Sequence, residues 1–455
     1  HCRRVLPRIC GADLRVGDLG GRVQHGLESL FSEAEGFLGD RVQQRGGYGV
    51  RMRMVESARQ DPGWDQVYVH WSRLAPDFAH LVERLSRLAR GLEDLTDVEA
   101  PDLETVRVRL VGLSRMLEEA HTQLDQFIRR PARNTITWLS RRQGRALTFN
   151  VAPLNVGALI QQDLLAKKRS VILTSATLRV EGSFDYMRDR LGAETADELA
   201  VGSPFDYPSV ALLYVLNDIP EPGTRGYQKT VEETLVDLFA ATQGRALALF
   251  TSYSQLKATT TAITEPLAKE GITVYSQGSG TSRSQLLESF RNEERVVLLG
   301  TRSFWEGVDV PGEALSCLVI AKLPFDVPSD PIVSARAEAY ESPFHQFMVP
   351  EAILRFMQGF GRLIRTAGDQ GIAVVLDRRL LSKGYGQRFI ASLPDPRIHV
   401  GSRSDLPAVA EQWVNGHGMP ASVYGGAAFD QDWDVSNQEY MVTDDEEDPP
   451  WFWGA

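Results

Sequence analysis

From about residue 146 onward, short apolar runs alternate with segments of helical character, and this alternation constrains the fold more than any other feature. The runs are rich in Val, Ile and Leu: ALTFNVAP, RSVILTSAT, VALLYVLND, RALALFTS, ITVYSQG, RVVLLGTRS, CLVIAKLP and IAVVLDRR. Strands of a parallel sheet are buried on both faces by crossover helices, so they read as near-continuous apolar runs. We therefore predict an α/β domain with a parallel sheet and flanking helices.

Upstream of these runs, two stretches show the 3-4 spacing of amphipathic helices. Their apolar positions are Trp71, Leu74, Phe78, Leu81, Leu85, Leu88, Leu92 and Leu95, then Leu103, Val106, Leu110, Leu113, Leu117, Ala120, Leu124 and Phe127. A short segment that contains Pro101 separates them. The pattern predicts two long helices in an antiparallel hairpin, whose seam is hydrophobic packing with no catalytic group.

Length, cysteine content and hydropathy limit the class of protein. A chain of 455 residues is expected to form two or three domains. No run of 18 apolar residues occurs, so we expect no membrane span, and the N-terminus lacks the apolar core of a secretory signal. Cys2, Cys10 and Cys317 are too few for a disulfide framework and form no CxxC pair. We therefore expect a cytoplasmic protein without a metal site.

The charge is uneven along the chain. The net charge of −11 argues against a protein that coats nucleic acid, yet residues 129–145 hold six arginines and no acidic residue. Salt limits the reach of distant charges to about 10 Å, so a local basic stretch can still bind phosphate. Either that stretch contacts nucleic acid or it is a solvated surface. Residues 444–448, DDEED, mark an acidic end.

Ligands of parallel sheets bind at the carboxyl ends of the strands, so the residues directly after each apolar run are the candidates for chemistry. These segments are TSATL (174–178), FTSY (250–253) and GTRSFWEGVDVPG (300–312), followed by QGFGRLIRT (358–366) after the helical stretch EAILRFM. Each segment alone is weak evidence, and TSAT by itself is as often structural as functional.

In this order and spacing, the four segments resemble motifs III, IV, V and VI of superfamily 2 helicases, and closely those of the DinG/XPD-like DNA helicases. GSPFDY (202–207) and LDRRLLSKGYG (376–386) fit the same pattern, and the helical hairpin is similar to the arch insertion of this family. The resemblance covers roughly residues 60 to 400. It implies a RecA-like sheet, the P-loop NTPase fold of a helicase C-terminal domain, preceded by an arch-like helical domain and part of a first RecA-like domain.

The resemblance also implies a division of the chain. We expect a remnant of the first motor domain or the start of the helical insertion at 1–60, and an arch-like helical domain at 61–145. The C-terminal part of the first RecA-like domain, with motif III, follows at 146–202. The second RecA-like domain, with motifs IV to VI, spans 203–400, and an acidic, partly disordered tail spans 401–455.

Motif VI is expected to act on a nucleotide. Arg362 and Arg365 are three residues apart, so on a helix they would share a face and both reach one triphosphate held by a partner domain. An arginine supplied in this way can raise the rate of phosphoryl transfer by about 10³–10⁵. Gly359 and Gly361 would keep that face clear, and Gln358 resembles the motif VI glutamine. The alternative is an ordinary solvated face.

Motif V would contribute to the same cleft through Glu306, Gly307 and Asp309, with Asp309 accepting from a ribose hydroxyl or holding a motif VI arginine. Trp305 would stack on a base or belong to the core, since base–aromatic stacking tolerates any sequence. The residues expected to contact nucleic acid or to couple it to the nucleotide are Thr174, Ser175, Thr177, Thr251, Ser252, Tyr253, Thr301, Arg302, Ser303 and Trp305.

Two motifs of the family do not occur in this sequence: a GxxxxGK[ST] loop and a DEAH-type box. We therefore expect the chain to be the C-terminal portion of an ATP-dependent DNA helicase, inactive alone, with ATP and Mg²⁺ bound mainly by the missing motifs. We expect no iron–sulfur cluster here. The family implies a monomer that moves 5′ to 3′ on single-stranded DNA in repair or replication. A nucleic-acid-binding module without ATPase activity and a non-helicase P-loop-type NTPase are the alternatives.

Overall fold

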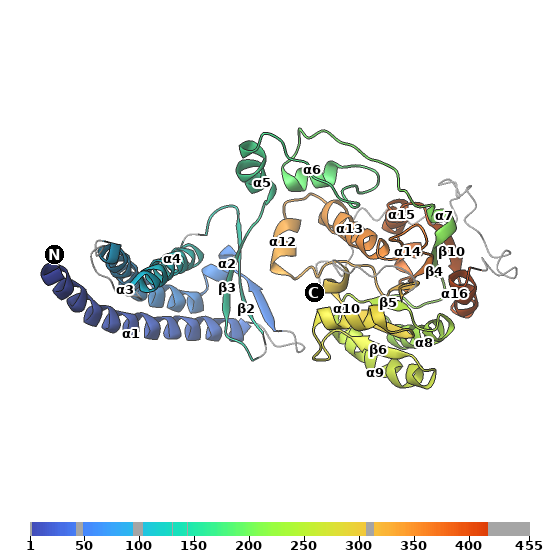
Figure 1. Cartoon of the computed structure of the whole chain (residues 1–455), viewed down its shortest axis with the longest axis horizontal. Helices are drawn as coiled ribbons and strands as arrows, with labels where there is room; N and C mark the ends of the chain where they lie inside the picture. Colours follow the sequence, from blue (N-terminus) through green and yellow to red (C-terminus); the bar gives the residue numbers. More distant parts are fainter. Residues whose placement is uncertain are drawn as a thin grey trace. The chain divides into compact units, whose positions relative to one another are not determined.

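The computed structural model describes residues 2–41, 49–93, 103–129, 131–142, 144–305 and 314–416. The chain divides into two compact units (Figure 1). Unit 1 contains residues 1–156 and 329–336, and unit 2 contains residues 157–328 and 337–455. Each unit has a hydrophobic core of its own.

Unit 1 is built around long helices. Trp71 Nε1 donates to Asp125 Oδ1 at 2.9 Å, and the hydroxyls of Ser86 and Ser114 lie 2.6 Å apart. As the residue number rises along the first helix, from 71 to 86, the number of its partner on the second helix falls, from 125 to 114. The two predicted helices therefore run antiparallel, and the hairpin is confirmed. Its turn lies outside the described residues. The helices of this unit are α1 (Cys2–Arg41), α2 (Glu56–Arg59), α3 (Pro62–Glu93), α4 (Leu103–Ile128) and most of α12 (Pro331–Ala337).

A small antiparallel sheet completes unit 1, with strands β1 (Val50–Arg53), β2 (Thr135–Arg141) and β3 (Thr148–Pro153) in that order. The run ALTFNVAP forms β3, but its expected place in the parallel sheet is wrong. β3 pairs instead with β2, which lies within the arginine-rich stretch. At about 3.3 Å per residue, the start of β2, which follows Arg133, and its end at Arg141 lie about 20 Å apart. The stretch is therefore two separate basic groups.

Unit 2 contains the predicted parallel sheet. Its strand order is β10-β4-β9-β8-β5-β7-β6, and every neighbouring pair is parallel. β4 to β9 coincide with six of the predicted runs. The strands are β4 (Ala211–Leu216), β5 (Ala246–Leu249), β6 (Thr273–Ser276), β7 (Val296–Gly300), β8 (Cys317–Ile320), β9 (Gly371–Val375) and β10 (Arg397–Gly401).

Helices cover both faces of this sheet (Figure 1). The helices α8 (Tyr227–Ala241), α9 (Tyr253–Lys269) and α16 (Leu406–Val414) share one core with alternate residues of the strands. Helix α13 (Val349–Phe360) lies on the opposite face, where Gly359 approaches Leu249 of β5. The other helices are α5 (Gly157–Asp163), α6 (Asp185–Leu191), α7 (Tyr207–Val210), α10 (Arg283–Asn292), α11 (Arg302–Trp305), α14 (Arg379–Ser382), α15 (Gly384–Ala391), the 3₁₀ turn Leu165–Lys167 and the π-helical turn Phe344–Met348.

The folded part of unit 2 extends past residue 400, where the sequence places the start of a tail. Trp413 on α16 is 2 % exposed, and its Nε1 donates to the carbonyl of Gly371 at 2.9 Å. This bond joins α16 to the first residue of β9. Residues up to 416 therefore belong to the ordered domain, and residues 417–455 lie outside the described residues.

The run RSVILTSAT is not a strand, contrary to the prediction. The backbone there is irregular, and Ile172 is 87 % exposed. A strand needs a neighbour that pairs with its N–H and C=O groups, and none of the described strands pairs with this run. The run therefore has the apolar composition of a strand, but it has no paired neighbour among the described strands and does not form a strand.

Strand β10 carries a buried histidine whose titration should make unit 2 sensitive to acid. His399 is 4 % exposed beside the ring of Tyr214, and burial lowers its pKa from the ordinary value near 6.5. The unfolded chain therefore binds this proton more readily, and stability falls as the pH drops below about 6.5.

We expect His399→Gln to lose less stability than the original chain between pH 7.5 and pH 5.5, by up to about 1.4 kcal/mol per pH unit. Urea unfolding followed by circular dichroism measures this difference, and carboxylates titrate alike in both proteins. Parallel pH profiles would contradict the assignment.

Candidate functional site

The carboxyl ends of β5, β7 and β8 meet at one edge of the sheet of unit 2, because these neighbouring strands are parallel. Phe250, Thr301 and Ala321 follow the three strands directly, and Thr251 comes one residue later. The expected motif IV and motif V segments therefore lie side by side, as the sequence predicts for strand ends of one parallel sheet.

The polar residues after β5 and β7 are held by local hydrogen bonds. Ser252 Oγ accepts from the backbone N–H of Gln255 and caps α9, while Thr251 is exposed. The backbone N–H and the hydroxyl of Thr301 both donate to Gln277 Oε1, at 2.8 and 2.7 Å. Gln277 is thus a residue of this edge that the sequence did not indicate.

Tyr253 begins α9 beside a glycine in the left-handed region. A Cβ on Gly278, whose φ is +92°, would lie 1.6 Å from the hydroxyl oxygen of Tyr253. Only glycine leaves room for the phenol there, and it also adopts this φ without strain. The ring of Tyr253 packs against the core of unit 2, so its placement is fixed by packing.

Trp305 is a core residue of the edge. It is 2 % exposed, its Nε1 donates to the carbonyl of Phe250 at 3.4 Å, and its ring lies 2.9 Å from where a Cβ of Gly359 would be. This burial fits the packing alternative for Trp305 and not stacking on a base. Gly359 is likewise buried beneath the indole, so in this structure it makes room for Trp305 and presents no bare surface to a ligand.

Helix α13 ends at Phe360, so the prediction that Arg362 and Arg365 share a helix face is wrong. Gly361 is the capping residue, and the backbone continues in tight turns: Arg362 N donates to the carbonyl of Gly359 at 3.1 Å. Both arginines therefore lie in the turn that follows the helix. A glycine on either side of Phe360 weakens helix continuation at this point.

Burial of two apolar residues and a buried carboxylate shape this turn. Leu363 and Ile364 are 2 and 3 % exposed. Asp369 Oδ2 accepts from the backbone N–H groups of Arg365 and Thr366 at 2.7 and 2.8 Å, and its Oδ1 accepts from the Thr366 hydroxyl at 2.7 Å. Asp369 thus fixes the backbone position of Arg365 through its N–H group.

Arg362 joins the motif VI turn to the end of α11. Its Nε and Nη2 donate to the carbonyl oxygen of Trp305 at 3.2 and 3.0 Å. Arg365 lies near Tyr207, since its charge partly offsets the rise in the tyrosine pKa that burial causes. The two arginines therefore have different surroundings, and Arg362 has a structural role that the sequence did not reveal.

A network of ion pairs extends from this edge along α13. Asp326, in the loop after β8, accepts from Arg302 Nη1 at 3.0 Å and also pairs with Arg355 of α13. Arg355 lies 3.4 Å from Glu351, which also accepts from the Tyr186 hydroxyl at 2.8 Å. Burial, and then Glu351, raise the pKa of that tyrosine. Arg355 and Glu351 lie four residues apart on α13, but the other pairs join different elements, so no sequence pattern indicates them.

A second ion pair is buried after β9. Asp377 is 0 % exposed, and its two oxygens accept from Arg379 Nε at 2.9 Å and Nη2 at 2.7 Å. Its Oδ2 also accepts from the backbone N–H of Leu323 at 2.8 Å, which joins the loops after β8 and β9. Burial lowers the pKa of Arg379, but the carboxylate of Asp377 outweighs this and raises it, so Arg379 stays charged.

Thr174, Ser175 and Thr177 do not follow a strand of this sheet. They lie in the irregular segment, and within the described part of the chain their hydrogen bonds stay between Ser175 and Thr177. Ser303 is exposed on α11. The residues Glu306, Gly307 and Asp309 lie outside the described residues.

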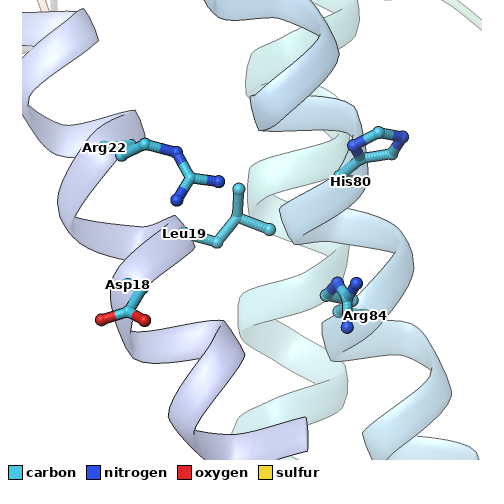
Figure 2. A pocket seen from close by; sticks show the side chains of 5 residues that line it. All are labelled: Asp18, Leu19, Arg22, His80 and Arg84. Atoms are coloured by element: carbon cyan, nitrogen blue, oxygen red, sulfur yellow. The ribbon is translucent and has the colours of Figure 1, made fainter.

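Unit 1 has a pocket of about 200 Å³ between α1 and α3, lined by Asp18, Leu19, Arg22, His80 and Arg84 (Figure 2). Arg22 already pairs with Asp77 at 3.0 Å. The pocket contains none of the predicted site residues. No group of three or more His, Cys, Asp or Glu side chains among the described residues is arranged to hold a metal ion. None of the described helices is both long and apolar enough to cross a membrane.

Comparison with known proteins agrees with the arrangement of this edge. Residues 235–396 match the family model described as "Helicase C-terminal domain". ATP-dependent DNA helicase YoaA of Haemophilus influenzae is 39 % identical over 55 % of this chain and 39 % of its own length. The 3′-5′ exonuclease DinG of Bacillus subtilis is 31 % identical over 74 % of this chain and 38 % of its own length. ATP-dependent helicase DinG of Mycobacterium tuberculosis is 38 % identical over 58 % of this chain and 41 % of its own length.

The matched segment contains β5 to β9 and the motif IV, V and VI segments, so unit 2 contains a helicase C-terminal domain. The identity that the chain shares with DinG and YoaA proteins supports a DinG-like helicase C-terminal portion. It spans about two fifths of the length of the curated relatives it matches.

Proposed function

We propose that this chain supplies the second motor domain of an ATP-dependent DNA helicase that moves 5′ to 3′ on single-stranded DNA in repair or replication. Arg362, Arg365 and Gln358 would face a nucleotide held by the GxxxxGK[ST] loop and DEAH box of a first motor domain. The loops after β5 and β7 would contact the DNA. We further propose that the protein acts as a monomer in the cytoplasm.

One observation carries this proposal: the segments resembling motifs IV, V and VI are joined by direct contacts at one edge of the sheet. Arg362 bonds the carbonyl of Trp305, Trp305 bonds the carbonyl of Phe250, and its ring packs on Gly359. A displacement of any of these segments therefore changes contacts with the other two. This is the arrangement that coupling between a nucleotide and a nucleic acid requires.

The residues of motif VI fit an anionic ligand that also carries donors. Gln358 Oε1 is buried, and no hydrogen-bond partner for it exists among the described residues. A buried acceptor without a donor is costly, and a donor on a bound molecule would satisfy it. The guanidinium groups of Arg362 and Arg365 supply cationic donors nearby in the chain. ATP with Mg²⁺ would supply the transferable phosphoryl group and water ligands that match this set.

In this proposal the residues at the edge of the sheet have separate roles. Arg365 stabilises negative charge on the phosphates, and Asp369 holds its backbone in place. Arg362 keeps α11 against α13, so that Arg302 and Thr301 stay at the DNA-binding edge. The exposed hydroxyl of Thr251 and the exposed guanidinium of Arg302 then contact DNA phosphates.

The irregular apolar run at 169–177 supports the presence of a first motor domain. The exposed side chains of Ile172, Leu199 and Val201 are 87, 83 and 81 % accessible, which is unusual for large aliphatic groups. A parallel sheet that paired with this run would cover Ile172, which lies within it. Thr174, Ser175 and Thr177 would then follow a true strand and reach the nucleotide edge of that sheet, as expected for motif III.

We expect the chain alone to bind single-stranded DNA, measured by fluorescence anisotropy, but to hydrolyse no ATP above background, because the sequence contains no GxxxxGK[ST] loop and no DEAH-type box. Binding should weaken with salt because phosphate contacts release counterions. Phosphate release with and without single-stranded DNA measures turnover. DNA-stimulated hydrolysis by this chain would contradict the assignment of the nucleotide site to another domain, and failure to bind DNA at low salt would contradict the assignment of the edge.

The absence of these two motifs also favours a second candidate, a nucleic-acid-binding module without ATPase activity. The two candidates differ in one measurement. If this chain is joined to a motor domain with a GxxxxGK[ST] loop, the helicase proposal expects DNA-stimulated hydrolysis that depends on Arg365. The binding-module proposal expects DNA binding without hydrolysis.

A further inference from the structure

Asp326 divides its carboxylate between two arginines with different exposure. Oδ1 accepts from Arg302 Nη1 at 3.0 Å, and Oδ2 pairs with Arg355 Nη2. The side chain of Arg302 is 72 % exposed, whereas those of Asp326 and Arg355 are 14 and 11 % exposed. A ligand from solution can therefore take Arg302 from Asp326, while Arg355 stays in place as part of the packed structure.

Arg355 fixes α13 to the loop after β8. Besides Asp326, it reaches the carbonyl of Pro324 at 3.1 Å and Glu351, one turn earlier on α13, at 3.4 Å. Helix α13 then carries Gln358 and ends just before Arg362. The position of Asp326 relative to Arg355 thus bears directly on where the motif VI residues lie.

Besides the packing of Trp305 on Gly359, two polar connections join α11 to α13 and the turn that follows it. One connection is the bond from Arg362 to the carbonyl of Trp305. The other is the chain of charges from Arg302 through Asp326 to Arg355. The first is part-buried, whereas the second has a solvent-exposed end at Arg302 and can respond to an anion that arrives from solution.

We propose that Asp326 is a positioning residue that couples a nucleic-acid phosphate at Arg302 to the placement of α13. This inference rests on the proposed function, since it takes Arg302 as a DNA contact. Phosphate and carboxylate oxygens compete for the same guanidinium donors. When DNA takes Arg302, Asp326 loses one of its two cationic partners and its full charge acts on Arg355. The helix that presents Gln358 and leads to Arg362 then shifts toward the loop after β8.

The competing explanation is that Asp326 only supports Arg355. In that case Asp326→Asn would weaken the packing of α13 and leave DNA binding unchanged. The coupling makes a different claim, namely that Asp326 restrains Arg302 in the free protein. Removing the carboxylate should then strengthen DNA binding, and the gain should vanish when Arg302 is absent.

The experiment measures binding of the full chain to a fluorescein-labelled oligodeoxythymidine by anisotropy, over a series of salt concentrations. We expect Asp326→Asn to tighten binding about two- to fivefold, the range expected for an ion pair with one exposed partner. Arg302→Ala should weaken binding and reduce the salt slope by about 0.7, as for one lost phosphate contact on single-stranded DNA. The double variant should bind as Arg302→Ala does.

Glu198→Gln is the matched control. Glu198 is a partly exposed acid of unit 2 that pairs with Arg188 at 2.8 Å, away from α11 and α13 in sequence. The Glu198→Gln substitution removes one negative charge, as Asp326→Asn does, but leaves the ion pair of Arg302 in place. A similar gain in Glu198→Gln, or a gain in Asp326→Asn that persists without Arg302, would show a general charge effect and overturn the coupling.

Hydrogen exchange of the α13 peptides gives a second readout that does not depend on Asp326→Asn folding well. Saturating DNA should change the exchange of residues 349–360 in the original chain and leave it unchanged in Arg302→Ala. An equal change in both proteins would overturn the coupling. Failure of the original chain to bind DNA at low salt would count against the proposed function itself, whereas normal binding without these Arg302-dependent effects would count against the coupling alone.

Discussion

Replacing Arg365 by alanine will reduce the ATP turnover of a helicase built from this chain and a P-loop motor domain by about 10³-fold or more. A guanidinium placed on a transferring phosphoryl group stabilises charge that develops only in the transition state, and its loss has effects of this size. The backbone of Arg365 is held by Asp369 and by the buried Leu363 and Ile364, so the turn should survive the change. The affinity for single-stranded DNA should therefore stay within about twofold.

Steady-state phosphate release at saturating DNA and ATP measures the effect. Arg225→Ala, which removes an exposed guanidinium from the loop before α8, is the matched control and should leave turnover unchanged. Arg362→Ala offers a contrast: it breaks the bond to the Trp305 carbonyl, so it should weaken DNA binding as well as turnover. Turnover of Arg365→Ala within tenfold of the original would mean that Arg365 does not reach the phosphates.

Replacing Asp377 by alanine will destabilise unit 2 by about 3–5 kcal/mol, because Arg379 would stay buried without its carboxylate. Arg379 is only 16 % exposed, and its Nε and Nη2 both donate to Asp377. The same change leaves the backbone N–H of Leu323 without its acceptor. We expect the double variant Asp377→Leu with Arg379→Met to be more stable than the single variant, since it leaves no buried charge.

Cys317 provides a site-specific measurement of this loss. Its thiol is fully buried on β8, and burial raises its pKa to about 12, so it should react only when unit 2 opens. Thiol labelling resolved by mass spectrometry separates its peptide from those of Cys2 and Cys10. Glu198→Ala, which removes half of a more exposed pair, should cost no more than about 1 kcal/mol. A loss below about 1 kcal/mol in Asp377→Ala would show that Arg379 reaches solvent.

The central strands were predictable because their environment leaves a direct mark on composition. Every residue of β4, β5, β7, β8 and β9 is buried, so helices on both faces select mostly Val, Leu, Ile and Ala. The sequence failed to indicate β10, an edge strand that alternates between exposed and buried residues over RIHVG. The same is true of β2, whose TITWLSR lies among arginines and was interpreted as a basic surface.

The neighbourhood of the site was predictable, but the roles of its side chains were not. Parallel strand ends must meet, so the segments at 250–253 and 300–305 come together regardless of detail. The end of α13 depends instead on Leu363 and Ile364 entering the core, and periodicity does not separate that outcome from a longer helix. Asp326 and Asp377 are isolated carboxylates in sequence. Their importance comes from arginines on other elements, and only the tertiary structure reveals it.

The strand order of unit 2 also sets when this domain can form during synthesis on the ribosome. β4 is the first of the seven strands to emerge, yet it pairs with β9 and β10, which are the last. From Leu216 to Gly371 is 371 − 216 = 155 residues, which translation at about 5–20 residues per second makes in roughly 10–30 s. Throughout that interval a wholly apolar strand has no neighbour. A nascent chain of this kind is a natural client for chaperones that hold extended hydrophobic segments until translation is complete.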